Sequence, residues 1–350
     1  MMFRQLYDAA SSTYTYLLAD PTTREAVLID PVFEQHARDA SLLRELGLTL
    51  LATVDTHCHA DHVTGAWLMH AALGSRIGLS PMYGAANVDL PLANGDLIRF
   101  GAHALRVATT PGHTDGCLTF VLDDGVMAFT GDALLIRAAG RTDFQHGDPA
   151  SLYQSIQQQI FTLPDTCQVW PAHDYEGRTC STVGEEKAFN PRIGGGAKVE
   201  DFVGYMRNMA LPHPKQIDIA LPANMRSGCP EDGQYPHKIT WGPVTRSYAG
   251  VPEVDPTWVA THRGELTLID VRSADELHGE LGSLSDARNI PLDALRDRLG
   301  EIADDRPIVT VCQTGKRSAM AAQILTKAGR SRVANAAGGM VRWRALGLPS

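Results

Sequence analysis

The sequence predicts an α/β protein made of two domains, a larger N-terminal one and a smaller C-terminal one. The chain has 350 residues, whereas a domain usually holds roughly 150, so a single hydrophobic core does not account for it. Its residues are 44% hydrophobic and 20% charged, which is typical of globular proteins. Strand-like runs alternate with turn signals and occasional helices in the first part of the chain and with helices in the last part, and the latter alternation favours a sheet covered by helices.

The first domain is expected over residues 1–228. Its predicted strands are apolar or β-branched runs bounded by turn signals: residues 14–18, 25–29, 48–54, 105–109, 117–122, 126–130 and 168–171. Its predicted helices have apolar residues at helical spacing: residues 37–46, 63–73 and 152–161. Gly74 is expected to end the second helix.

Residues 229–251 are predicted to be an interdomain linker, because proline and glycine recur there without a periodic apolar pattern. The second domain is expected over residues 252–350. Compact strand–helix units begin beyond the linker, with strands at 267–271 and 307–311 and helices at 292–299 and 318–328. This alternation predicts a parallel sheet flanked by helices.

Composition also excludes some classes of function. The chain has 31 Lys and Arg against 40 Asp and Glu, a net charge of -9, so we expect no nucleic-acid partner. No stretch reaches the ~20 apolar residues of a spanning helix, so we expect no membrane insertion. The six cysteines are scattered, and the N-terminus lacks a signal-peptide pattern, so a cytoplasmic, unprocessed protein is expected.

A cluster of potential metal ligands follows the predicted strand 48–54. Residues 56–62 read Thr-His-Cys-His-Ala-Asp-His and supply His57, His59, Asp61 and His62. Three further ligand-type residues, His113, Asp132 and His173, lie in loops beside later predicted strands. Loops at strand ends are where a rigid sheet presents functional side chains. The set therefore predicts a metal site.

This pattern resembles the metallo-β-lactamase superfamily, whose mark is HxHxDH followed by separated His, Asp and His. The resemblance covers about residues 1–228 and implies an αββα sandwich with the metal site at one edge. A binuclear hydrolase would place one metal on His57, His59 and His113 and a second on Asp61, His62 and His173, with Asp132 bridging. A mononuclear oxygenase would use only His57, His113 and Asp132. Because all seven residues are present, counting ligands leaves both open.

Segments around the site resemble the persulfide dioxygenase branch: residues 134–145, 171–175, 190–192 and 221–225. Two histidines and one carboxylate form the open site of non-haem Fe(II) oxygenases. The resemblance implies one Fe(II) per chain and oxidation of glutathione persulfide by O2 to sulfite and glutathione. It also implies glutathione contacts from Arg141, Tyr175, Arg137 and Arg192. The residues expected to support the ligands are His59, Asp61, His62, His173 and Asp174.

A second reactive segment, Cys312–Ser318, lies between a predicted strand and a predicted helix and reads Cys-Gln-Thr-Gly-Lys-Arg-Ser. Loop N–H groups and a helix N-terminus both favour a thiolate at Cys312. Lys316 and Arg317 add positive charge. The catalytic residues expected here are Cys312, Lys316 and Arg317, within a loop completed by Gln313, Thr314, Gly315 and Ser318.

This loop resembles that of the rhodanese family, supported by residues 268–272, 287–292 and 338–343. The resemblance covers about residues 252–350 and implies sulfur transfer between thiosulfate, glutathione and sulfite through a Cys312 persulfide. Together the two halves resemble persulfide dioxygenase–rhodanese fusion proteins, and the branch suggests a possible homodimer. Two alternatives stay open: a glyoxalase II-like binuclear zinc thioester hydrolase fused to a rhodanese, and a non-catalytic scaffold carrying a sulfur-relay module.

Overall fold

The computed structural model describes residues 1–123, 125–209, 211–212, 214–236 and 240–349. The chain forms two compact units, Met1–Pro236 and His237–Ser350. Each is described by itself, and the predicted limits at residues 228 and 252 stay predictions. None of the described helices is both long and apolar enough to cross a bilayer.

The first unit contains two six-stranded sheets. The strands of the first sheet, in spatial order, are β1 (Met2–Asp8), β2 (Thr13–Ala19), β3 (Glu25–Ile29), β4 (Thr49–Val54), β5 (Arg76–Leu79) and β6 (Leu90–Pro91). Those of the second are β12 (Ser181–Thr182), β11 (Gln168–Pro171), β10 (Met127–Gly131), β9 (Leu118–Leu122), β8 (His103–Thr109) and β7 (Leu97–Phe100). Pairing in the first sheet is antiparallel up to β3 and parallel from β3 to β6. In the second sheet only β10 and β11 run parallel.

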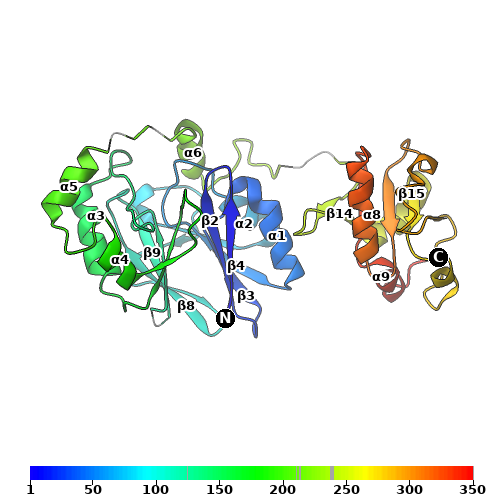
Figure 1. The fold of residues 1–350 in the computed structure, drawn as a ribbon, viewed down its shortest axis with the longest axis horizontal. Coiled ribbons are helices and arrows are strands. Elements are labelled where there is room, and N and C mark those ends of the chain that lie inside the picture. Colours follow the sequence, from blue (N-terminus) through cyan, green and yellow to red (C-terminus); the bar gives the residue numbers. More distant parts are fainter. Residues whose placement is uncertain (124, 210, 213, 237–239, 350) are drawn as a thin grey trace. The chain divides into compact units, whose positions relative to one another are not determined.

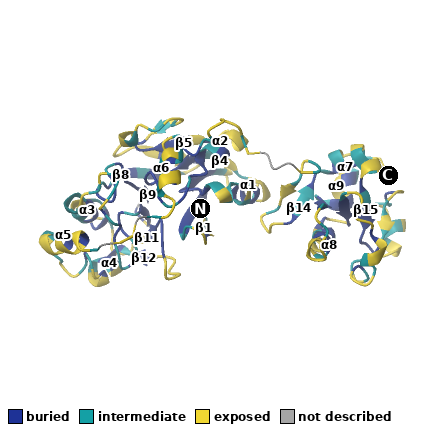
Figure 2. Cartoon of the chain, turned by 90° about the horizontal axis from the view of Figure 1, so that it is seen from above, coloured by how far each residue is buried: buried dark blue, intermediate teal, exposed yellow. Residues whose placement is uncertain are grey.

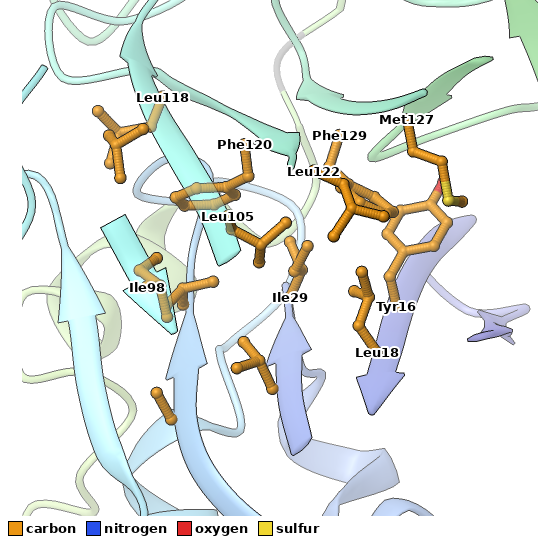
Figure 3. Close-up of a cluster of buried hydrophobic side chains, with 14 of the residues drawn as sticks. Tyr16, Leu18, Ile29, Ile98, Leu105, Leu118, Phe120, Leu122, Met127 and Phe129 are labelled. Atoms are coloured by element: carbon orange, nitrogen blue, oxygen red, sulfur yellow. The ribbon is translucent and has the colours of Figure 1, made fainter. Parts of the chain in front are cut away.

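The two sheets pack face to face over one apolar core. Tyr16, Leu18 and Ile29 from the first sheet meet Phe120 and Phe129 from the second, as Figure 3 shows. Alternate residues of β2 and β3 point the other way, because side chains alternate across a strand. Leu17 and Leu28 accordingly join a separate cluster on the outer face.

Helices cover both outer faces of the sandwich. The helices of this unit are α1 (His36–Glu45), α2 (Ala66–Leu73), α3 (Pro149–Ser155) with a π-helical continuation (Ile156–Ile160), α4 (Val183–Phe189), α5 (Val199–Arg207) and α6 (Ile217–Asn224). Helices α1 and α2 pack on the first sheet, and α3, α4 and α5 on the second (Figure 1). The result is the expected αββα arrangement.

The second unit is a single six-stranded sheet with helices on both faces. Its strands, in spatial order, are β13 (Thr245–Arg246), β14 (Pro252–Val254), β18 (Val333–Ala336), β17 (Ile308–Val311), β15 (Thr267–Asp270) and β16 (Arg288–Asn289). All pairs are parallel except β13 with β14. Helix α8 (Lys316–Lys327) packs on one face, and α7 (Pro256–His262) and α9 (Gly339–Ala345) pack on the other. Figure 2 shows the strands buried and the helices exposed on their outer sides.

Short 3-10 turns connect these elements: Phe33–Gln35, Pro81–Tyr83 (η2), Arg263–Glu265, Asp275–His278 and Leu299–Glu301. The helix predicted at residues 292–299 is wrong. That segment folds as successive turns, such as Leu295 N–H to the Leu292 carbonyl and Ala294 N–H to the Pro291 carbonyl. The leucine spacing still serves packing, because Leu295 is buried against the sheet.

Candidate metal centre and sulfur-transfer loop

The predicted ligands leave the ends of strands from both sheets and meet at one edge of the sandwich. His57 follows β4 and Asp132 follows β10, while His113 lies in the loop between β8 and β9. Backbone hydrogen bonds tie these loops together, including Leu118 N–H to the Thr56 carbonyl at 2.8 Å. The edge is therefore a rigid frame that holds side chains from distant parts of the sequence.

His57, His113 and Asp132 come together as a set. One ligand atom from each lies within 4.8 Å of the others. The His113 Nε2 atom is 3.6 Å from an Asp132 carboxylate oxygen, and the rings of His57 and His113 are perpendicular with centroids 4.9 Å apart. Both histidines are buried, so their nitrogen lone pairs face this small volume rather than solvent.

Hydrogen bonds fix which nitrogen of each imidazole is free. His113 Nδ1 lies 2.7 Å from the Arg141 carbonyl, which can only accept, so Nδ1 carries the proton and Nε2 keeps its lone pair. The Thr56 hydroxyl donates to Asp30 and lies 3.1 Å from His57 Nδ1. It therefore accepts from that nitrogen, and His57 Nε2 is likewise free to bind a metal.

The third candidate metal ligand, Asp132, is also suited to binding a metal. Its Oδ1 atom is buried and has no hydrogen-bond partner among the described residues, although His173 Nε2 lies 3.7 Å away. A metal ion would satisfy this oxygen. Two neutral imidazoles and one carboxylate suit a divalent transition metal. Burial lowers the pKa of His57 well below its ordinary value, which keeps it in the neutral, metal-binding form.

A second group of ligand atoms lies next to the first. His59, Asp61 and His173 also each place one atom within 4.8 Å of the others. Burial alone would raise the pKa of Asp61, but His173 and His62 lower it well below its ordinary value. Burial alone would lower the pKa of His173, and the opposing effect of Asp61 and Asp132 raises it instead. These residues form a charge-coupled group beside the triad.

In His59 and in His62, one ring nitrogen is hydrogen-bonded and the other is not. His59 Nε2 lies 3.2 Å from an oxygen of Asp30, and His62 Nδ1 lies 3.1 Å from Asp61. His59 Nδ1 and His62 Nε2 have no hydrogen-bond partner in the described structure. Asp174 accepts hydrogen bonds from the Glu176 and Arg178 backbones and so shapes the following turn.

The predicted glutathione contacts differ in what their side chains touch. Arg141 is bound to Asp143 at 2.7 Å and to the carbonyls of 211 and 212. Arg137 pairs with Glu186, and Arg192 donates to the Ala139 carbonyl at 2.6 Å. Tyr175 stacks on His173 with centroids 6.1 Å apart, and it is 70% exposed.

Sequence reasoning missed the residues that hold the ligand loop. Asn224 on α6 donates to the carbonyls of His59 and His62 and accepts the Thr64 N–H. Asp30, at the end of β3, accepts the Thr56 N–H at 2.6 Å. Asp30 could have been noticed in the sequence as a polar residue at the end of a buried strand. Its hydrogen-bond partner Thr56 lies too far away in the sequence to be identified without the fold.

In the second unit, the chain turns sharply between β17 and α8. Cys312 is buried, and its Sγ accepts a hydrogen bond from Gly315 N–H at 3.2 Å. The Ser318 hydroxyl has one proton and two acceptors, Sγ at 3.2 Å and Asn335 Oδ1 at 2.6 Å. Gly315 has a φ of +87°, which favours glycine. Burial alone would raise the pKa of Cys312, but the hydrogen bonds from Ser318 and the loop backbone lower it below its ordinary value.

The two cations of this loop have different surroundings. Arg317 makes a two-point ion pair with Glu276, with both nitrogen–oxygen distances 2.6 Å. Lys316 is exposed, as are Gln313 and Thr314. Beneath the loop, a buried ion pair joins Arg272 to Asp270 at 2.6 Å. The loop therefore presents backbone N–H groups to the thiolate, with Lys316 exposed beside it and the charge of Arg317 paired with Glu276.

Comparisons with known proteins agree with both halves. Residues 9–173 match the metallo-beta-lactamase superfamily, and residues 255–346 match the rhodanese-like domain. The mitochondrial persulfide dioxygenase ETHE1 proteins of Mus musculus and Homo sapiens are each 54% identical over 228 residues, which is 65% of this chain and 89% of theirs.

Two solved structures extend the comparison. The crystal structure of ETHE1 from Myxococcus xanthus is 48% identical, with a TM-score of 0.63, and covers 65% of this chain and all of its own. A metallo-beta-lactamase structure from Staphylococcus aureus is 24% identical with a TM-score of 0.61, over 96% of this chain and 98% of its own. The latter supports the fold alone.

Proposed function

Because the chain belongs to the persulfide dioxygenase family of the metallo-β-lactamase superfamily and carries a C-terminal rhodanese-like domain, we propose that it is a bifunctional enzyme of sulfur metabolism. The first unit oxidises glutathione persulfide with O2, and the second transfers sulfane sulfur. The observation that carries the first activity is the convergence of His57, His113 and Asp132 in a chain 54% identical to persulfide dioxygenases.

The metal of the first unit is proposed to be one Fe(II), held by His57, His113 and Asp132. When bound there, ferrous iron supplies vacant coordination positions for O2 and for a sulfur ligand. The chain's own contribution is orientation. The Arg141 carbonyl and the Thr56 hydroxyl hold the two imidazoles with Nε2 toward the metal position.

The proposed reaction consumes glutathione persulfide, O2 and water and yields glutathione, sulfite and two protons. The outer sulfur is oxidised, O2 is reduced, and the sulfur–sulfur bond breaks to release the glutathione thiol. Tyr175 is the proposed glutathione contact with an exposed ring, stacked on His173. Arg141, Arg137 and Arg192 remain proposed contacts, but a glutathione carboxylate would have to share guanidinium groups already bonded within the chain.

The second unit is proposed to transfer sulfur through Cys312. The thiolate attacks the outer sulfur of thiosulfate, sulfite leaves, and a Cys312 persulfide forms. Glutathione thiolate then takes this sulfur, which regenerates Cys312 and yields glutathione persulfide, the substrate of the first unit. Support comes from the hydrogen bonds of Gly315 and Ser318 to Sγ, which stabilise negative charge on sulfur.

An oxygen-electrode assay with glutathione persulfide tests the proposal. The iron-loaded protein is expected to consume O2 and to produce sulfite. His113→Ala is expected to abolish O2 uptake but to retain thiosulfate:glutathione sulfur transfer, whereas Cys312→Ser is expected to do the reverse. Cys180→Ser, which removes an exposed free thiol, is the control that leaves both activities intact. Absence of O2 uptake by the iron-loaded protein would contradict the dioxygenase.

The binuclear zinc hydrolase remains the rival, since His59, Asp61 and His173 form a second group of ligand atoms. In that case the protein would hydrolyse glutathione thioesters without consuming O2. A chain that binds no metal yet transfers sulfur would instead support the scaffold alternative. A homodimer and a cytoplasmic location also remain proposals, the latter supported by six unpaired cysteines.

A further inference from the structure

Tyr83 lies between the two loops that carry the proposed histidine ligands, although its own element contributes no ligand. It ends η2, directly after β5. Its hydroxyl lies 2.5 Å from the Thr114 hydroxyl, and the phenol oxygen also lies near the backbone of Cys58. Cys58 adjoins His57, and Thr114 adjoins His113. One phenol group therefore connects the neighbours of both ligands.

The hydrogen bonds can be ordered from donor to acceptor. Burial raises the pKa of Tyr83 well above its ordinary value, so the phenol stays protonated. The Cys58 N–H near the phenol oxygen is a donor and offers no acceptor, so the phenol is expected to give its own proton to Thr114. The Thr114 hydroxyl is then free to donate to Cys117 Sγ, at 3.1 Å. The three side chains therefore form a series of hydrogen bonds that runs from Tyr83 to Thr114 and on to Cys117.

Packing leaves the ring little freedom. A Cβ atom placed on Gly116 would lie 2.5 Å from Cζ of Tyr83, so the ring lies directly against this backbone. Only glycine permits that approach. The Cys58 carbonyl is also held, by a hydrogen bond of 2.8 Å from Gln145. The contact thus joins two loops that are already restrained on their other sides.

We propose that Tyr83 is a positioning residue that fixes the separation of His57 and His113 through its hydrogen bond to Thr114, its packing against Gly116 and its proximity to the Cys58 backbone. This inference rests on the metal site of the proposed function but not on the reaction carried out there. Tyr83 lies outside the loops that carry the ligands, yet it holds those loops in place around the metal position. A ligand pair restrained in this way should release its metal slowly.

The test measures metal release, with Co(II) as the probe. Metal-free protein is loaded with Co(II), and loss of its absorption bands is followed after a chelator is added. Tyr83→Phe, which keeps the ring, is expected to accelerate release roughly three- to tenfold. Thr114→Val should also accelerate release, and the double variant should be no faster than Tyr83→Phe alone, since that substitution already removes the bond to Thr114. Thr114→Ser, which keeps the hydroxyl, should release Co(II) at the wild-type rate.

Tyr153→Phe is the matched control, because it removes a comparable phenol bond, to the Ala197 carbonyl at 2.8 Å, away from the ligand loops. Thermal unfolding of each metal-free variant separates loss of fold from loss of positioning. Wild-type release from Tyr83→Phe would overturn the inference, as would equal acceleration by Tyr153→Phe at equal stability. Failure of the proposed dioxygenase would instead show as absent O2 uptake with slow Co(II) release intact.

Discussion

At the scale of single residues, the chemistry depends on where protons lie. His113 and His57 each have Nδ1 committed to an oxygen acceptor, so each has Nε2 available. The sequence shows where a histidine lies but not which of its ring nitrogens carries the proton. For His113 this is decided by the Arg141 carbonyl, which lies 28 residues away in the sequence. Cys312 differs, because its partner Ser318 lies only six residues away, in the loop that the sequence already predicts.

Ser318→Ala should shift the reactivity of Cys312 to higher pH. The Ser318 hydroxyl is the largest of the hydrogen-bonding contributions that lower the pKa of Cys312, and its removal destabilises the thiolate relative to the thiol. The pKa therefore rises, and a smaller thiolate fraction remains at any pH below it. Alkylation rates with iodoacetamide, measured against pH with Cys312→Ser as background, report this shift. An unchanged or acid-shifted profile would rule out the hydroxyl as the stabilising group.

At the scale of elements, the site depends on how strands end. Asp132 follows Gly131, the last residue of β10, whose φ is +54°. A Cβ atom on Gly131 would lie 2.7 Å from the Thr56 side chain, which orients His57. The end of β10 and the start of the His57 loop are therefore in contact at a point where only glycine fits.

Gly131→Ala should therefore weaken metal binding as well as the fold. The left-handed backbone and the close contact together should cost roughly 1–3 kcal/mol of unfolding free energy. Displacement of Thr56 should also lower metal affinity by about tenfold or more. Gly125→Ala is the control: its φ is +82°, but its nearest neighbour is 3.5 Å away. If both variants bound Co(II) equally tightly, the contact with Thr56 would have no role in the site.

Many of the strands could be predicted from the sequence. Apolar runs located β4, β8, β9, β10 and β11, because buried strands impose a strong local pattern. The helix predicted at 292–299 failed because the same leucine spacing serves a series of turns packed on a sheet. The three arginines assigned to glutathione illustrate another limit. Their partners, such as Glu186 for Arg137, come from segments whose proximity only the fold creates.

At the scale of the whole molecule, each unit has its own buried core. The first unit has one core between its sheets and one beneath each helical layer. The second has an apolar cluster on each face of its single sheet. The predicted fold class is confirmed. Separate cores are consistent with the two activities proposed for this chain.

Titration of metal-free protein with Fe(II), followed as O2 uptake in the presence of glutathione persulfide, tests the central claim most directly. We expect uptake to rise linearly and to saturate near one equivalent of Fe(II) per chain, with sulfite formed in proportion to the O2 consumed. Zinc should give no uptake. Saturation only near two equivalents, or thioester hydrolysis supported by zinc with no O2 consumed at any iron level, would contradict it.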